Sequence, residues 1–275
     1  MRHRPAAVGV DAAARPAAGR RRAAFTLLVV ASVVYNDWLL EFLVPTGLDP
    51  ANSYVSETFA ADQPHRVLFS GIELTCAALL VAAALCMYGE SARTPARAGW
   101  VAIGAFGGFS TLDVMVPMRC APSLGGGCEA VNPWHTTTSG LVHFALFASM
   151  ALFVADARRR NGVSHGPVHR WGPWLLLFSM AAALATVGPL FGHPGGQGVA
   201  QRLHLLTVGL WFLLLAAGLR PRAVSLTDEP GSGPSAAGTG TPAPTSTPAP
   251  TRAGRSATPK GVSRRGLGGG FRGSR

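Results

Sequence analysis

Charged residues are scarce in this chain. They make up 13% of the 275 residues, whereas soluble domains carry about 25%. Acidic residues are the rarer kind, with 13 Asp and Glu against 24 Lys and Arg. Because 48% of the residues are hydrophobic, this composition argues against a soluble globular protein.

Motifs of soluble enzymes are also missing. No Gly-x-Gly-x-x-Gly follows a predicted strand, and there is neither a phosphate-binding loop nor a Gly-x-Ser-x-Gly. His-Glu-x-x-His is absent as well, which removes the commonest helical zinc motif of proteases. The sequence therefore gives no direct indication of a nucleotide-binding enzyme, a serine hydrolase or a zinc protease.

Six apolar segments of about 20 residues each are the main feature that is present. A bilayer core is about 30 Å thick and an α-helix rises about 1.5 Å per residue, so each segment is long enough to span it. Helices satisfy their own backbone hydrogen bonds in lipid, and we therefore expect an all-α polytopic transmembrane bundle with six spans. The segments are residues 24–45, 66–88, 98–117, 136–156, 172–192 and 199–219.

Positive charge is concentrated on one side of this six-span arrangement. Of the 24 Lys and Arg, only Arg66, Arg119 and Arg202 fall on the other side. Positively charged loops stay in the cytoplasm, so both termini are expected to face inward, in the plasma membrane. We interpret the basic excess as a topology signal and as attraction of the tails to anionic lipid, not as nucleic-acid binding.

Three regions are expected along the chain. Residues 1–23 form a basic N-terminal tail and residues 24–219 the membrane domain. Residues 220–275 are rich in Pro, Thr and Gly, and end in a basic stretch. Both tails lack the apolar residues that offset chain entropy, and we expect them to be disordered.

Two of the four cysteines, Cys120 and Cys128, lie in the same outward loop. That location is oxidising, so they are candidates for a disulfide, with an expected stabilisation of about 2–3 kcal/mol. A pair of metal ligands is the alternative, although a spacing of eight suits it poorly. In the third segment, Gly104 and Gly108 form a small-xxx-small face, with Gly107 beside them, on which a neighbouring helix could pack closely.

Ionisable residues occur inside the apolar segments, all near their outer ends. A carboxylate at mid-bilayer costs roughly 2.5–3.5 kcal/mol, so such residues mark functional sites. Asp37 and Glu41 are four apart and are expected to share one helical face. Together with a glutamate of the first outer loop, these residues predict an outward-facing polar pocket. The candidates are Asp37, Glu41, Glu57, Glu73, Asp113, His143, Arg202 and His204.

The leading interpretation of this pocket is a non-enzymatic one. The polar band would hold the head group of a membrane lipid or lipid-like ligand, with no cofactor. A structural interpretation stays open, in which Asp37 and Arg202 form an ion pair. The sequence specifies neither the ligand nor the oligomeric state.

Two other functions use the same residues. In a metal-dependent intramembrane hydrolase, Asp113, His143 and His204, with His135 as a further donor, would hold zinc, and Glu73 would act as the base.

In a proton-coupled transporter, Asp37, Glu73 and His143 would relay protons. No inverted repeat of the kind found in many transporters is visible in the sequence.

The order of these features resembles a bacterial family known as domain of unknown function 998, which consists of six-helix membrane proteins. The resemblance covers about residues 24–219 and rests on Asn-Ser-Tyr-Val-Ser-Glu at 52–57, on Asp113 and Pro117, on His143, and on Gln201-Arg202. The family often has Pro-Cys-Asp after its third helix, whereas here Asp113 precedes Pro117. The resemblance implies a fold and a membrane location and no particular activity.

Overall fold

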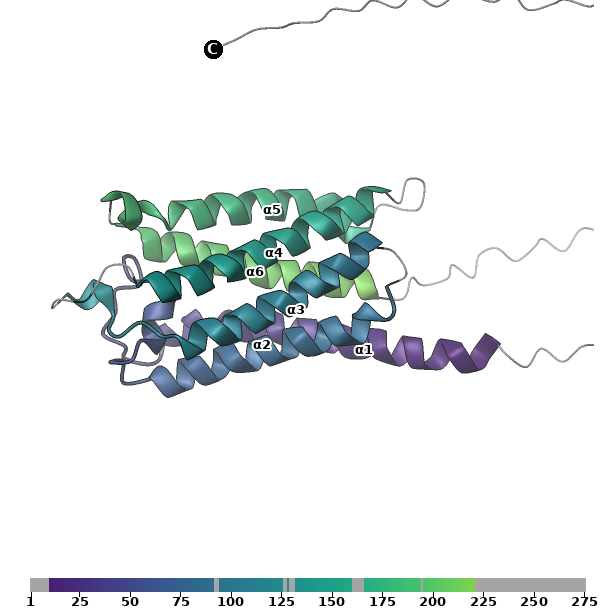
Figure 1. The fold of residues 1–275 in the computed structure, drawn as a ribbon, viewed down its shortest axis with the longest axis horizontal. Coiled ribbons are helices and arrows are strands. Elements are labelled where there is room, and N and C mark those ends of the chain that lie inside the picture. The colour runs from purple at the N-terminus through teal and green to yellow at the C-terminus, as the bar shows by residue number, and fades with distance from the viewer. Residues whose placement is uncertain are drawn as a thin grey trace, which may run out of the picture. The chain divides into compact units, whose positions relative to one another are not determined.

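Six α-helices lie side by side in the computed structural model of this protein, among the residues that it describes (Figure 1). The described residues are 10–91, 94–125, 128, 132–159, 166–193 and 195–220. The helices are α1 (Val10–Val34), α2 (Arg66–Tyr88), α3 (Thr94–Met115), α4 (Pro133–Arg159), α5 (Pro167–Ala185) and α6 (Gln197–Leu219). Short 3₁₀ segments connect them: η1 (Asp37–Phe42), η2 (Val55–Phe59), η3 (Pro122–Leu124) and η4 (Gly188–Phe191).

The bundle has two different ends. α1 begins and α6 ends at one of them, which we call the terminal end (Figure 1). The four 3₁₀ segments gather at the other, which we call the capped end. α3 packs between α2 and α4, and α6 packs between α1 and α5.

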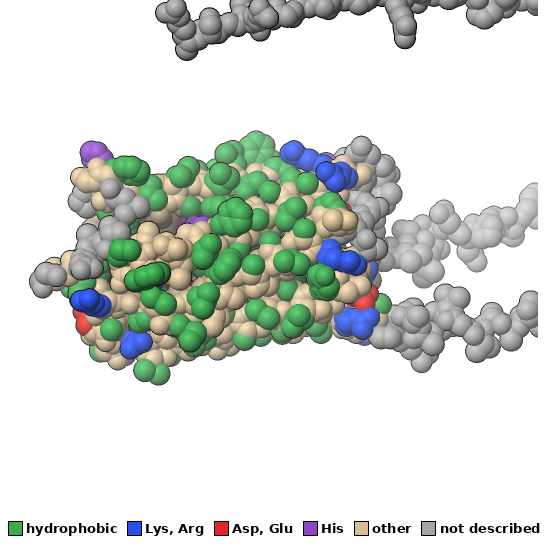
Figure 2. All heavy atoms as spheres, viewed as in Figure 1, with side chains coloured by type: hydrophobic (Ala, Val, Ile, Leu, Met, Phe, Trp, Pro, Cys, Tyr) green, Lys and Arg blue, Asp and Glu red, His purple; other side chains and the backbone are tan. Residues whose placement is uncertain are grey.

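Apolar side chains cover the body of the molecule, and charged side chains lie at both ends (Figure 2). Val33, Leu85 and Phe144 are each 72% exposed on the outer faces of their helices. Inside the bundle, Phe106, Trp211 and Phe212 are completely or almost completely buried. An apolar surface around an apolar core is what lipid requires and water disfavours, so the chain is a multi-pass membrane protein.

Five described helical stretches are long and apolar enough to cross a membrane. They contain α1 with η1, α2, α3, α4 and α6. The fifth expected segment, 172–192, differs from the prediction because α5 ends at Ala185 and the chain continues as η4. α5 is 19 residues long and begins with polar residues that include His169 and Arg170.

Two expected boundaries of the first helix are corrected. α1 begins at Val10, so residues 10–23 are helical rather than a disordered tail, as their many alanines and arginines favour. α1 also ends at Val34 instead of continuing to residue 45. Asn36 lies at this break, where its side-chain amide donates to the Ser32 carbonyl at 2.9 Å. The expected C-terminal tail after Arg220 lies outside the described residues.

The close packing of α2 against α3 depends on Gly107. A Cβ atom there would lie 2.6 Å from the Ala77 carbonyl oxygen, whereas at Gly108 it would meet nothing within 4 Å. At Gly104 it would make an ordinary 3.5 Å contact with Ala84. The expectation is therefore wrong for Gly108, which does not lie at the contact between the helices. Gly107 is the position where the helices need a glycine.

Candidate functional site

Five of the eight predicted pocket residues line one cavity near the capped end. We call Asp37, Glu73, Asp113, His143 and His204 the cavity cluster. They come from η1, α2, α3, α4 and α6 and surround a volume of about 100 Å³, room for several water molecules. The rest of the wall consists of Tyr35, Val55, Ser56, Thr58, Phe59, Phe106, Ser110, Ser139, Val142, Leu146, Gln201 and Leu205.

Asp113 is held at the wall by α4. Its Oδ1 accepts hydrogen bonds from the hydroxyl groups of Thr138 and Ser139, the second at 3.0 Å. His135 Nδ1 lies 3.2 Å from the same oxygen but has no hydrogen-bond geometry toward it. The first turns of α4 therefore fix the Asp113 carboxylate in position.

His143 and His204 form a stacked pair on the wall. Their ring centroids are 4.9 Å apart and the rings are inclined by 16°. Nδ1 of His143 lies 2.7 Å from the Ser139 carbonyl oxygen, and Nδ1 of His204 lies 3.0 Å from that of Ser179. A carbonyl oxygen only accepts, which favours a proton on each Nδ1, and the Ser179 hydroxyl also lies 3.0 Å from Nδ1 of His204. With the proton on Nδ1, Nε2 of an uncharged ring is an acceptor.

Asp37 and Glu73 complete the acidic part of the cavity. No described Lys or Arg lines the cavity, and none forms an ion pair with either carboxylate. Ser110 lies next to Glu73 and is 3% exposed, but its hydroxyl has no hydrogen bond of acceptable geometry to a described residue. The cavity thus combines half-buried carboxylates with the buried Ser110 hydroxyl, whose nearest polar neighbour is Glu73.

The other three predicted residues, Glu41, Glu57 and Arg202, do not line the cavity, and we call them the cap cluster. Arg202 forms an ion pair with Glu41, and both side chains are almost completely buried, at 7% and 1% exposure. The Arg202 guanidinium also donates to the carbonyls of Pro50 and Ser53 on the first loop, at 2.7 and 3.0 Å.

The expected pairing of Asp37 with Arg202 is therefore wrong, because Glu41 is the partner. The expectation that Asp37 and Glu41 share a helical face is also wrong. Both residues lie in the 3₁₀ segment η1, where positions four apart differ by about 120° around the axis instead of about 40°. Asp37 faces the cavity, and Glu41 faces Arg202 on α6.

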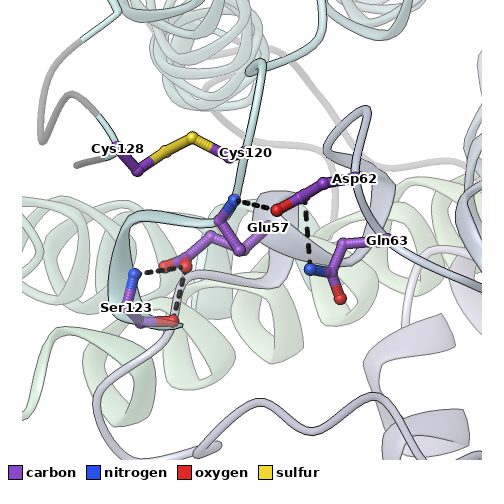
Figure 3. Close-up of a disulfide and its surroundings, with 7 residues drawn as sticks. Glu57, Asp62, Gln63, Cys120, Ser123 and Cys128 are labelled. Carbon is purple, nitrogen blue, oxygen red and sulfur yellow. Dashed lines mark hydrogen bonds between the residues drawn. A yellow bond between two sulfur atoms is a disulfide. The ribbon is translucent and has the colours of Figure 1, made fainter. Parts of the chain in front are cut away.

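Glu57 joins the loop between α1 and α2 to the loop between α3 and α4 (Figure 3). Its carboxylate accepts from the Tyr54 amide at 2.8 Å, from the Ser123 amide at 2.9 Å and from the Ser123 hydroxyl at 2.5 Å. The side chain is buried, and the residue is 1% exposed. Because η2 also contributes to the cavity wall, Glu57 holds one side of the cavity in place, although its own side chain does not line it.

A disulfide joins Cys120 and Cys128 beside this connection (Figure 3). Two further hydrogen bonds tie its loop to the first loop: Ala121 N donates to Asp62 Oδ2 at 3.3 Å, and Ala61 N donates to the Met118 carbonyl at 2.8 Å. The bridge therefore closes the short loop that presents Ser123 to Glu57.

Two titratable groups of the loop between α1 and α2 have shifted pKa values. Hydrogen bonds from the Ala51 amide and the Asn52 side chain hold the pKa of Asp49 below its ordinary value. Burial, with the nearby Glu57 carboxylate, raises the pKa of Tyr54, whose hydroxyl donates to the Thr186 carbonyl at 2.7 Å. Both groups stabilise the conformation of the loop.

The predicted zinc site of Asp113, His143 and His204 is not formed. Within the described part of the chain, no three His, Cys, Asp or Glu side chains come together in a way that could hold a metal ion. The Nδ1 atoms of both histidines bond to backbone carbonyls, and Asp113 bonds to α4 hydroxyl groups. The three side chains therefore line the same cavity without converging on one point.

Several uncharged members of the wall were not predicted as site residues from the sequence, among them Tyr35, Phe106, Ser110 and Gln201. Serines and aromatic residues are common in membrane helices, so their types gave no signal. The position of Ser110, one turn before Asp113 on α3, is the one local hint that the sequence offers.

Comparison with known proteins gives one match. No curated protein and no solved structure matches the chain. The family model described as "Protein of unknown function (DUF998)" matches residues 26–218, which include every member of the cavity and cap clusters. The chain is therefore a member of the DUF998 family.

Proposed function

We propose that this protein is a plasma-membrane binding or sensing protein that holds the polar part of a lipid-like ligand in the cavity cluster. The observation that carries this proposal is the cavity itself, in which carboxylates from three elements face a space inside an apolar-surfaced bundle. Buried ionisable groups without a partner are costly, and in membrane proteins they mark binding sites or ion paths.

The surroundings of the cavity support a ligand with both polar and apolar parts. Its wall contains Leu146, Leu205 and Phe106 beside the ionisable groups. Such a mixture of a mainly apolar lining with a few convergent polar groups is typical of small-molecule sites. A lipid-like molecule would leave its chain among the helices and place its head group in the cavity.

We further propose six spans, with α5 as the sixth, and both termini in the cytoplasm. The support is the distribution of arginines: Arg20, Arg158 and Arg159 lie toward the terminal end, as the positive-inside rule requires of a cytoplasmic side. A reporter enzyme that is active only outside the cytoplasm should be inactive when it is fused after Arg220. The same reporter should be active when it is inserted after Leu124. Activity after Arg220 would overturn this topology. The basic tails are proposed to contact anionic lipid on the same side.

The binding proposal is tested by thermal unfolding of the detergent-purified protein against a panel of bilayer lipids and single-chain amphiphiles. Ser110→Leu fills the cavity, and Gly108→Leu, on the same helix, places the same side chain in open space. We expect at least one panel member to stabilise the wild type and Gly108→Leu but not Ser110→Leu. If every panel member leaves the wild-type melting temperature unchanged, the proposal is wrong.

A further inference from the structure

We propose that the head group bound in the cavity is an organic cation, an ammonium group with hydrogen-bond donors. This inference rests on the proposed function, because it names the chemical class of the ligand for the same cavity. It follows from the kinds of polar atom in the wall and from the aromatic rings beside them. It also follows from the finding that no described side chains are arranged to coordinate a metal ion.

The wall is rich in acceptors. Asp37 and Glu73 contribute carboxylate oxygens, and His143 and His204 offer Nε2 as an acceptor when their rings are uncharged, because Nδ1 lies against a backbone carbonyl. No described Lys or Arg is among the lining residues. A ligand that brought a negative charge or further acceptors would therefore find no cationic partner there.

A buried, unpartnered group supports the same assignment independently. The Ser110 hydroxyl is 3% exposed, lies in the wall and has no hydrogen bond of acceptable geometry to a described residue. Buried hydroxyl groups are ordinarily hydrogen-bonded. Because a hydroxyl can both donate and accept, it can receive an N–H from a bound ammonium group and donate to the adjacent Glu73.

Aromatic rings favour an organic cation over an inorganic one. Tyr35, Phe59 and Phe106 line the cavity, and the Tyr35 and Phe106 rings lie 5.7 Å apart. The face of an aromatic ring attracts an ammonium group, more strongly where water is excluded. In the described residues, by contrast, no three ligating side chains are close enough to coordinate a metal ion.

The experiment compares three amphiphiles that share a dodecyl chain and differ in charge: dodecylammonium, dodecanol and dodecanoate. Each is added to the full-length protein in a neutral detergent at neutral pH, and the melting temperature is measured against ligand concentration. The variants are Asp37→Asn and Glu73→Gln in the cavity. Glu90→Gln is the control, because it removes a carboxylate that pairs with Arg20 far from the cavity.

We expect dodecylammonium to raise the melting temperature of the wild type and of Glu90→Gln, and the other two amphiphiles to have little effect. Glu73→Gln and Asp37→Asn should each weaken the apparent affinity for dodecylammonium by at least about tenfold, since each removes a buried charge partner. The melting temperature of each variant without ligand shows whether it folds.

The outcomes separate this inference from the proposed function. Equal stabilisation by all three amphiphiles, lost in Ser110→Leu, would overturn the cation assignment and leave the lipid-like ligand in place. Stabilisation by dodecylammonium that is unchanged in Glu73→Gln and Asp37→Asn would place the cation elsewhere and overturn the assignment. No stabilisation by any of the three, or by the lipid panel, would overturn both.

Discussion

The cavity cluster and the cap cluster contain similar residues at the same end of the bundle, yet they differ in how their charges are balanced. In the cap cluster, Arg202 pairs with Glu41 and binds two carbonyls of the first loop. In the cavity cluster, Asp37 and Glu73 face a space that is lined by two histidines but by no described Lys or Arg. The first arrangement balances its charges within the protein, although Glu41 Oε1 and Arg202 Nε have no hydrogen-bond partner among the described residues, and the second leaves its carboxylates without a cationic side chain. Charge inside a membrane protein therefore indicates a binding site only where the protein leaves it unbalanced.

The largest effect is expected from breaking the cap cluster. Arg202→Met leaves the buried Glu41 carboxylate and the carbonyls of Pro50 and Ser53 without their partner, so we expect a loss of about 3–5 kcal/mol in unfolding free energy. Reversible unfolding in mixed micelles measures this loss. The double variant Arg202→Met/Glu41→Gln should recover part of it, and a double variant as unstable as the single one would contradict the ion-pair account.

The disulfide should have the next largest effect. Replacing Cys120 and Cys128 with serine, or reducing the bond, should lower the unfolding free energy by about 2–3 kcal/mol, because the open loop gains entropy when unfolded. Thermal unfolding with and without reductant measures the difference. The free cysteines Cys76 and Cys86 provide the control, since Cys86→Ser should leave the response to reductant unchanged.

Two neighbouring glycines of α3 should differ in how their substitution affects the packing of α2 against α3. Gly107→Ala places a Cβ 2.6 Å from the Ala77 carbonyl oxygen and should destabilise the protein by about 1–3 kcal/mol. Gly108→Ala meets nothing within 4 Å and should be neutral or slightly stabilising, because alanine favours a helix. Similar melting temperatures for the two variants would show that the helices are not in close contact at Gly107.

The smallest effect on stability is expected in the cavity cluster, with the opposite sign. Glu73→Gln removes a half-buried carboxylate that has no Lys or Arg partner among the described residues, so the free energy of unfolding should stay the same or rise by about 1 kcal/mol. Thermal unfolding without ligand measures this change. A loss of several kcal/mol would show that Glu73 is a structural group like Arg202.

Much of the fold followed from hydrophobic run length alone. The second and sixth segments were predicted to within two residues of α2 and α6 at each end. The first and fifth segments ran past the ends of α1 and α5 in the prediction, because apolar content does not distinguish an α-helix from the 3₁₀ turns η1 and η4. Asn36 and Pro189 mark these breaks in the sequence, but each residue also occurs within helices of membrane proteins.

The candidate site was predictable as a set of residues but not as two clusters. The depth of Asp37, Glu41 and Glu73 along their segments follows from counting residues. Which of them meets Arg202 depends on the 3₁₀ geometry of η1 and on how the first loop docks on α6. That docking needs Gly198, where a Cβ would lie 2.4 Å from the Pro50 carbonyl oxygen. Such a contact between distant segments leaves no periodic signal in the sequence.

The most direct test of this account compares Glu73→Gln with Glu57→Gln, two identical substitutions of buried glutamates in the two clusters. Dodecylammonium affinity and ligand-free unfolding free energy are measured for both variants and for the wild type. The account predicts that Glu73→Gln keeps its stability and loses binding. It predicts that Glu57→Gln loses stability, because its carboxylate bonds to Tyr54 and Ser123, and binds the ligand whenever it is folded. Binding retained by Glu73→Gln, together with a loss of stability equal to that of Glu57→Gln, would contradict it.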